Sequence, residues 1–341
     1  MLDIDKRQVD FLVTENMVNE VKTFLERDAS KVRMIALEMA DRDIERLYFV
    51  ACGSPLSAAQ TTQFLVDRYS SIPCNAYDGS DFLDNPPSKL DETCAVVAIS
   101  QSGKTEEVVE ALKLAKSRGA FTVAATNEEQ CPLYEEADRA IAYHAECIWE
   151  IHLLVGYTLA IELISRKEGA KTELDQILQD LNKLPDVLDK LVNNLEQEGK
   201  ELGKKASGWN FIYTVSSGPL KPLGYKEGVI TLMEFTWTHG CALESGEFRH
   251  GPLEIVEQGV PFIFLLGTDG SRHTTERALN FVKRYTDNVI VFDYADLSQG
   301  LHPMLAPMVL FVPLEWFCYY LAIYKDHNPD NRRYYGGLVQ Y

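Results

Sequence analysis

The pattern of apolar and polar positions predicts helices at the start of the chain and then strands separated by helices. In the first 45 residues, MVNEVKTFLERD and SKVRMIALEMADR place apolar residues three and four positions apart, as amphipathic helices do. Largely apolar runs follow, with helical patterns between them, at residues 47–53, 94–100 and 121–126, and ADRAIAYH at 137–144 is the candidate for a fourth strand. Runs without polar alternation are typical of strands in a parallel sheet that helices cover on both faces. This half of the chain therefore predicts a doubly wound α/β unit.

The same theme restarts after a long helical stretch over residues 149–207. The predicted elements of the second half are strands at 211–220, 241–245, 261–267 and 288–294 and a final helix around 303–326. ACGSPL at 51–56 aligns with VSSGPL at 215–220, and both place Pro-Leu after small residues at a strand end. Duplication explains this match better than an accidental likeness between two α/β halves. We therefore predict an α/β fold of two tandem doubly wound, flavodoxin-like parallel-sheet units.

A chain of 341 residues suits two domains of ordinary size. The predicted parts are a helical extension over 1–30, a first unit over 31–170, a helical linker over 171–207, a second unit over 208–326 and a C-terminal tail over 327–341.

Composition and charge narrow the classes of partner and of site. The formal net charge is -18 at pH 7, and such a surface repels phosphate backbones and anionic lipid, so we expect neither nucleic acid nor membrane partners. The longest apolar stretch, 304–324, contains two prolines and a glutamate, and no secretory signal opens the chain, so we expect a soluble, cytoplasmic protein. The seven cysteines are scattered and form no CxxC pair, which argues against a disulfide framework and a structural zinc site.

The loop after the second predicted strand, AISQSGKTEE, has the chemistry of a phosphate site. Its side-chain donors are Ser100, Gln101, Ser102 and Thr105, and the loop after the first strand adds Ser54. At a helix start, such donors act together with the positive end of the helix dipole on a bound oxyanion. One serine supported by Glu106 would suffice as a simple helix cap, but four donors in six residues exceed that need. The second half has Asp269 at the equivalent place, where a carboxylate repels an anion, so only the first unit is expected to bind phosphate.

The stretch ESGEFRHGPLE raises a second candidate, because His250 stands directly before Gly251-Pro252. Taken alone, this is an ordinary surface histidine beside a turn. Sixteen residues earlier, Glu234 lies in the apolar pattern VITLMEFTW, where burial would raise its pKa toward neutrality and suit it to act as a general base. The alternative is an ion-paired or solvated helix carboxylate. Glu227, two helical turns before Glu234, either joins the same pocket or pairs with a basic side chain.

Other aromatic and imidazole side chains carry weaker signals. No motif supports His239 or His152, and a packed or surface histidine is the better interpretation of each. Trp237 is better explained as a core or interface aromatic than as a substrate contact.

The chain resembles the sugar isomerase (SIS) family through SQSGKTEE, which is similar to that family's phosphate loop, and through GEFRHGPLEI, which is similar to its HGP stretch. YFVACGSP, LMEFTWTHGCALESGEFRHGPLEIVE and RRYYGGLVQY resemble the deglycases that act on phosphorylated Amadori conjugates. That resemblance implies cleavage of fructoselysine 6-phosphate with water to glucose 6-phosphate and lysine. It implies Glu234 as the base, His250 as the acid, and no metal or other cofactor.

The resemblance also bears on the C-terminal tail and on assembly. The tail has no lysine after Lys325, unlike the isomerase domain of glucosamine-6-phosphate synthase, and Arg333 or Tyr334 occupies that region as a candidate substrate contact. Arg332 and Arg333 either bind a carboxylate of the amino-acid part or anchor the tail against a neighbouring subunit. Active sites of this family often lie at subunit interfaces, so the resemblance implies a homodimer or a higher homo-oligomer with a small phosphosugar-amine as substrate.

The implied chemistry needs only a positioned acid and base. His250 opens the sugar ring, a carboxylate removes a proton from C1 to give an enaminol, reprotonation at C2 gives an imine, and water hydrolyses the imine. Three alternatives remain at this point: a phosphosugar aldose-ketose isomerase, a deglycase for another amino-acid conjugate, and a sugar-phosphate sensor without catalysis.

Overall fold

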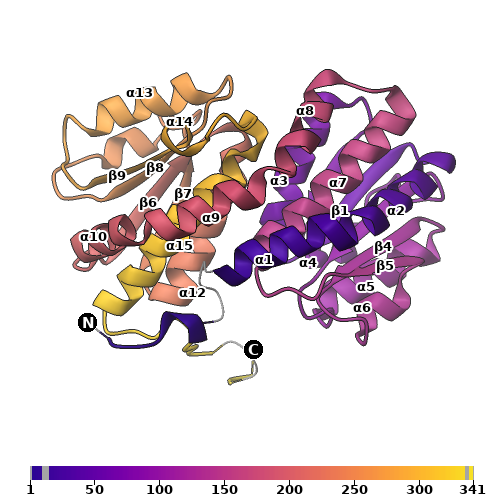
Figure 1. The fold of residues 1–341 in the computed structure, drawn as a ribbon, viewed down its shortest axis with the longest axis horizontal. Helices are drawn as coiled ribbons and strands as arrows, with labels where there is room; N and C mark the ends of the chain where they lie inside the picture. The colour runs from indigo at the N-terminus through magenta and orange to yellow at the C-terminus, as the bar shows by residue number, and fades with distance from the viewer. Residues whose placement is uncertain (1, 10–14, 335–337, 341) are drawn as a thin grey trace. The chain divides into compact units, whose positions relative to one another are not determined.

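The computed structural model describes residues 2–9, 15–334 and 338–340 (Figure 1). The chain divides into two compact units. The N-terminal unit comprises Asn16–Pro185, and the C-terminal unit comprises Met1–Glu15 together with Asp186–Tyr341.

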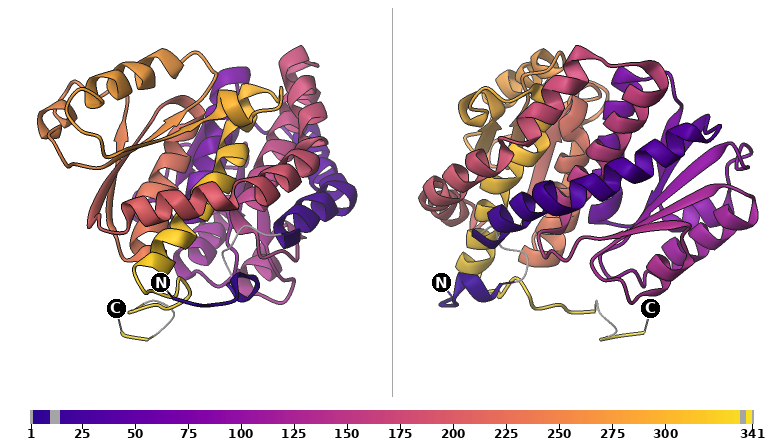
Figure 2. Two further views of the ribbon diagram at one scale, coloured as in Figure 1. Left: turned by 60° about the vertical axis from the view of Figure 1, so that its left-hand side comes forward. Right: turned by 45° about the vertical axis from the view of Figure 1, so that its right-hand side comes forward.

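The N-terminal unit is built on a parallel sheet of five strands in the order β2-β1-β3-β4-β5. The strands are β1 (Arg46–Ala51), β2 (Cys74–Tyr77), β3 (Cys94–Ile99), β4 (Phe121–Thr126) and β5 (Arg139–Ala142). Every residue of β3 and β4 is buried, because these strands lie inside the sheet and are covered on both faces (Figure 2). The four predicted runs are confirmed as strands, and β2 is an edge strand that the apolar pattern did not predict.

Helices pack on this sheet and on one another. They are α1 (Glu15–Thr23), the π-helix η2 (Phe24–Asp28), α2 (Ala29–Asp41), α3 (Ser54–Tyr69), α4 (Gly79–Asp84), α5 (Glu106–Ser117), α6 (Pro132–Glu136), α7 (Ile148–Glu168) and α8 (Thr172–Leu181). The predicted helices of the first 45 residues are confirmed as α1 and α2. The core helix α7 contacts both α2 and α3 and is almost completely buried.

The C-terminal unit repeats the arrangement with a parallel sheet in the order β7-β6-β8-β9. Its strands are β6 (Phe211–Ser216), β7 (His239–Glu244), β8 (Phe262–Leu266) and β9 (Val289–Asp293). β6 occupies the place of β1 and β8 that of β3, so the aligned segments ACGSPL and VSSGPL follow equivalent strands. The prediction of two tandem parallel-sheet units is confirmed.

The helical elements of the C-terminal unit are mostly shorter than those of the N-terminal unit and include several 3₁₀-helices and a π-helix. They are η1 (Lys6–Gln8), α9 (Leu184–Asn194, which starts at the boundary), α10 (Glu196–Ala206), η3 (Gly218–Leu220), α11 (Lys221–Tyr225), the π-helix η4 (Lys226–Thr231), α12 (Leu232–Thr236), η5 (Pro252–Ile255), α13 (Arg272–Val282), α14 (Tyr294–Leu297), η6 (Pro303–Leu305) and α15 (Ala306–Tyr324). α15 is the central helix and lies along α10 (Figure 1). The predicted helical stretch over 149–207 consists of four helices, α7 to α10.

Among the described residues, two helical segments are long and apolar enough to cross a membrane, Ile148–Glu168 and Pro303–Tyr324. Their most apolar windows are 83% and 94% buried, and each packs against helices of its own unit. Such burial is what core helices of a globular protein show.

Candidate functional site

The hydroxyl-rich loops of the N-terminal unit lie next to each other at the carboxyl ends of its strands β1 and β3. β1 and β3 are neighbours, with Ala51 opposite Ile99 at their carboxyl ends. Ser54 opens α3 just after β1, and Ser100 follows β3 directly. The strand order reverses between β1 and β3, and open α/β sheets bind ligands at such a switch point.

The loop after β3 is shaped by its own hydrogen bonds. Ser100 Oγ and Thr105 Oγ1 are hydrogen-bonded at 2.9 Å, and Ser102 Oγ accepts a bond from the Lys104 amide at 3.2 Å. Gly103 has φ +60, and a Cβ there would collide with the side chain of Cys131, so this turn requires glycine. Thr105 is the N-cap residue of α5, and its side chain makes no cap hydrogen bond. Neither serine therefore serves as the simple helix cap, and the first amides of α5 have no intrahelical partner.

The Gln101 side chain supports this loop from behind. Tyr143 OH donates to Gln101 Oε1 at 2.6 Å, and Gln101 Nε2 donates to the Ala145 carbonyl at 2.9 Å. Tyr143 OH is also 2.7 Å from Nε2 of His152, which is fully buried. Burial lowers the pKa of His152 to about 3, so its ring is neutral. Because Tyr143 gives its one hydroxyl proton to Gln101, this ring donates to Tyr143 from Nε2. His152 is a packed histidine, as expected, and the Gln101 carboxamide is already engaged within the protein.

The equivalent crevice of the C-terminal unit is filled by its own carboxylate. Asp269 Oδ1 accepts a hydrogen bond from the Ser271 amide at 2.8 Å. A Cβ at Gly218 would lie 2.8 Å from the same oxygen, so the carboxylate occupies the space between the loops that follow β6 and β8. An anion at this position would meet a negative charge, as the sequence indicated for Asp269.

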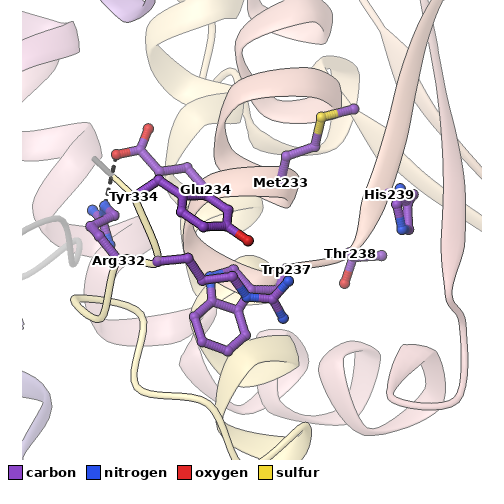
Figure 3. A pocket seen from close by; sticks show the side chains of 8 residues that line it. Met233, Glu234, Trp237, Thr238, His239, Arg332 and Tyr334 are labelled. Atoms are coloured by element: carbon purple, nitrogen blue, oxygen red, sulfur yellow. Dashed lines mark hydrogen bonds and ion pairs between the residues drawn. The ribbon is translucent and has the colours of Figure 1, made fainter. Parts of the chain in front are cut away.

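A cavity of about 350 Å³ lies beside Glu234 in the C-terminal unit. Its walls come from α12, the turn that follows it, the first residue of β7 and the C-terminal tail (Figure 3). The lining residues are Met233, Glu234, Trp237, Thr238, His239, Arg332, Arg333 and Tyr334.

The expected burial of Glu234 is wrong. Leu232 and Thr236 form the buried side of the short helix α12, so Glu234 points outward and its side chain is 30% exposed. Arg332 Nε donates to Glu234 Oε1 at 2.8 Å (Figure 3). The guanidinium also lies over the Phe235 ring, 4.2 Å from its centroid. Of the two alternatives for Glu234, the structure shows the ion-paired carboxylate, which also faces the cavity.

The tail residues are fixed on their own chain. Arg333 lies over the Trp237 ring at 3.9 Å, and the His327 ring contacts the same indole at 3.9 Å. Trp237 ends α12 with φ 51, a left-handed conformation that is uncommon for a residue with a side chain. Burial, together with the charges of Arg332 and Arg333, lowers the pKa of His327 to about 4. These contacts anchor the tail beside Glu234.

Glu227 does not line this cavity. It lies in the π-helix η4, where it is buried and pairs with Lys226 at 2.8 Å. Lys226 also pairs with Glu315 of α15 at 2.5 Å. The wide turns of the π-helix change the angular relation between Glu227 and Glu234 that a regular α-helix would give. The alternative in which Glu227 pairs with a basic side chain is the one observed.

His250 lies at the opposite end of β7 from Glu234. Glu234 precedes the first residue of this strand, whereas His250 is exposed in the turn that follows its last residue, Glu244. A strand of six residues spans roughly 17–20 Å at its usual rise. The HGP turn is confirmed, with Gly251 at φ 131 and Pro252 opening η5. Within one chain, however, Glu234 lies near the amino-terminal end of β7 and His250 near its carboxyl-terminal end.

Sequence reasoning missed four residues of the cavity: it did not consider Met233 and Thr238, and it interpreted Trp237 and His239 as packed or surface side chains. The available signal for Trp237 and His239 was their position three and five residues after Glu234, just before a strand. Within the part of the chain that the structure describes, no three His, Cys, Asp or Glu side chains are grouped as a metal site requires.

Known proteins match both the first unit and the whole chain. The SIS domain family matches residues 42–164. The fructoselysine 6-phosphate deglycase of Escherichia coli (strain K12) is 61% identical over 341 residues, which cover both chains completely. The fructosamine deglycase of Bacillus subtilis (strain 168) is 31% identical over 89% of this chain and 95% of its own.

Solved structures show the same architecture. A Bacillus subtilis structure described as a phosphosugar isomerase superposes with a TM-score of 0.85 at 30% identity, over 92% of this chain and 97% of the other. The C-terminal domain of glucosamine-fructose-6-phosphate aminotransferase from Francisella tularensis shares the fold, with a TM-score of 0.78 at 20% identity over 92% and 97%. Residues 42–164 match the SIS domain, and a full-length relative is 61% identical, so this chain belongs to the fructoselysine 6-phosphate deglycase family.

Proposed function

We propose that the protein is a fructoselysine 6-phosphate deglycase, which releases glucose 6-phosphate and lysine from its substrate with one molecule of water. The observation that carries this function is the 61% identity to such a deglycase over the full length of both chains. The test is to incubate the purified protein with fructoselysine 6-phosphate and to measure both products. Release of neither product would rule this function out.

Glu234 is the proposed base. It is the carboxylate of the cavity, and Arg332 holds its orientation at 2.8 Å. Removing a proton from C1 of the open-chain ketose gives an enaminol, and returning a proton to C2 gives an imine of glucose. Water adds to that imine, and the amine leaves. Replacing Glu234 with Gln should lower kcat by about 10²–10⁴, the range of a general base, while the substrate still binds.

His250 is the proposed acid, and we propose that it acts on the substrate held by another copy of the chain. The support is geometric, because Glu234 and His250 lie at opposite ends of β7 within one chain. A closed symmetric dimer brings such distant residues together twice, once in each site. The proposed assembly is thus a homodimer or a higher homo-oligomer with shared active sites.

Mixing two inactive variants tests this arrangement. Glu234→Ala and His250→Ala proteins should each be inactive, whereas subunits that exchange between them restore one intact site per mixed dimer, about a quarter of the wild-type activity. Persistent inactivity after verified subunit exchange would place both residues in the site of a single chain.

Ser54, Ser100, Ser102 and Thr105 are the proposed ligands of the substrate phosphate, with backbone amides at the start of α5. Their support is the convergence of the loops after β1 and β3 at the switch point. Because its side chain is engaged with Tyr143 and Ala145, Gln101 contributes through its backbone amide.

Calorimetry with glucose 6-phosphate tests this phosphate site. Ser102→Ala should weaken binding, and Ser117→Ala, an exposed serine at the end of α5, is the matched control. Equal affinities of the two variants would contradict the assignment.

Sugar phosphates do not cross membranes unaided, so the proposed substrate supports a soluble protein in the cytoplasm.

A further inference from the structure

We propose that the cavity beside Glu234 binds the amino-acid end of the substrate, with Arg333 pairing with its α-carboxylate and with Met233 and Trp237 packing against its methylene chain. This inference rests on the proposed function. It assigns specificity to residues of the tail and of the turn after α12.

Chemical connectivity requires the amino acid to lie near Glu234. The proposed base takes its proton from C1, and C1 is the carbon that carries the lysine nitrogen. The amino-acid chain therefore begins one bond from the reacting atom. The cavity beside Glu234 is lined by residues of the C-terminal unit alone, and its volume of about 350 Å³ is large enough for a flexible side chain.

The walls of the cavity suit an aliphatic chain. Met233 is 43% exposed and Trp237 is 39% exposed, although most large apolar side chains of this protein are buried. Both line the same cavity as Glu234 (Figure 3). Apolar walls with a few placed polar groups are the usual composition of a small-molecule site.

The charges of the cavity suit a carboxylate. Arg332 is already paired with Glu234, so these two charges compensate each other. Arg333 stacks on Trp237, and among the described residues no carboxylate lies within ion-pair distance of its guanidinium. A stacked guanidinium keeps its N–H edge available, and that edge matches a carboxylate in a bidentate pair. In a chain of net charge -18, a guanidinium at a cavity wall that has no carboxylate partner among the described residues is suited to an anionic group.

A pair of substrates isolates the carboxylate. One is fructoselysine 6-phosphate, and the other is the conjugate made from glucose 6-phosphate and 1,5-diaminopentane, which has the same methylene chain and terminal ammonium but no carboxylate. Wild-type kcat/KM should be about 10- to 100-fold higher for the lysine conjugate, since a charge-assisted hydrogen-bonded pair contributes about 1.5–3 kcal/mol.

Arg333→Gln should reduce this preference to a few-fold, chiefly through a higher KM for the lysine conjugate. Arg284→Gln removes an exposed arginine of the same unit outside the cavity and should keep the wild-type preference. Inhibition by free lysine gives a second measurement, which Arg333→Gln should weaken and Arg284→Gln should not.

The outcomes separate this inference from the function on which it rests. If the wild-type protein cleaves both conjugates equally well, or if Arg333→Gln lowers both rates by the same factor, the inference is wrong and the deglycase function stands. If the wild-type protein cleaves neither conjugate, the function itself fails.

Discussion

At the scale of single residues, the buried ion cluster of the C-terminal unit contains one lysine and two glutamates, so its net charge depends on the protonation of one carboxyl group. Lys226 is buried with two carboxylates, Glu227 and Glu315. Burial raises the pKa of Glu315 well above its ordinary value of 4.5, although the charge of Lys226 opposes this. A proton on Glu315 leaves Lys226 and Glu227 as one pair of opposite charges, so the cluster is neutral overall. A neutral buried cluster is far less costly than one with an excess charge.

Two substitutions should therefore have very different effects on stability. Lys226→Met leaves a buried carboxylate without its partner and should lower the free energy of unfolding by about 3–5 kcal/mol. Glu315→Gln copies the protonated acid and should cost less than about 1.5 kcal/mol. Urea denaturation at pH 7 measures both, and equal losses would mean that Glu315 is ionised.

The raised pKa of Glu315 also gives a direction with pH. Because the unfolded chain releases this proton above about 4.5 while the folded chain keeps it, the contribution is complete below that pH and is lost as the pH rises through the higher folded value. Glu315→Gln should flatten this part of the stability curve.

At the scale of elements, the helix that carries Glu234 packs on its sheet through glycine. A Cβ at Gly240 would collide with the carbonyl of Gly228 in the π-helix η4, and a Cβ at Gly228 would lie 2.7 Å from Thr214 of β6. The backbones of η4 and β7 thus approach each other directly, and the Thr214 side chain of β6 lies against Gly228. This contact fixes the position of α12, because α12 continues directly from η4.

Adding one methyl group at this contact should displace α12, the helix that carries the proposed base Glu234. Gly240→Ala should destabilise the protein by about 1–3 kcal/mol, as overpacking does, and should lower kcat more than it changes phosphate affinity. Gly208→Ala is the control, because a Cβ there meets no atom within 4 Å. Unchanged turnover in a folded Gly240→Ala protein would show that the position of α12 does not depend on this contact.

The contact between the end of α15 and the tail responds to pH through His327. This ring is buried against Trp237 and lies near the charges of Arg332 and Arg333, and its pKa is lowered to about 4. The unfolded histidine takes up a proton below about 6.5, whereas the folded one does so only near 4. The unfolded state therefore binds more protons in this window, and stability falls as the pH drops from about 6.5 to about 4.

His327→Gln should remove that part of the pH dependence. The measurement is the midpoint of thermal unfolding between pH 7.5 and pH 4 for the wild-type protein and the variant. Parallel curves over the whole range would contradict the assignment.

The apolar pattern predicted the central strands but not the details that decide the site. β3 and β4 are buried on both faces, so β3 is entirely apolar and β4 contains only Thr122 and Thr126 besides apolar residues, which makes both strands easy to recognise. β2 has four residues, three of them partly exposed at the sheet edge, and so its pattern is indistinct. Glu234 pairs with Arg332, which is 98 positions away in sequence, and its helix continues from a π-helix that periodicity does not predict.

At the scale of the whole molecule, segments from both ends of the chain complete the C-terminal unit. The amide of Leu2 donates to the carbonyl of Ile323 at 3.0 Å, and the tail reaches the cavity through Arg332 and Arg333. The tail therefore forms part of the cavity beside Glu234, even though it contains little regular structure.

Two truncations test the role of the tail. A chain that ends at Asn331 loses Arg332, Arg333 and Tyr334 and should have a kcat/KM lower by at least about tenfold, since Glu234 loses its orienting partner. A chain that ends at Tyr334 keeps these residues and should retain clearly more activity. Equal activity of the two truncated proteins, at equal helical content, would contradict this role.

The carboxylate of Asp269 affects whether the stability of the C-terminal unit depends on the concentration of sugar phosphate. The crevice that it fills needs no external anion, so the stability of the C-terminal unit does not depend on the sugar phosphate concentration at that place. The crevice of the N-terminal unit presents helix-start amides that a phosphate would satisfy, and a ligand that binds the folded state shifts the unfolding equilibrium by mass action. Under the proposed phosphate assignment, the stability of the N-terminal unit depends on its ligand, whereas the corresponding crevice of the C-terminal unit is stabilised by its own carboxylate.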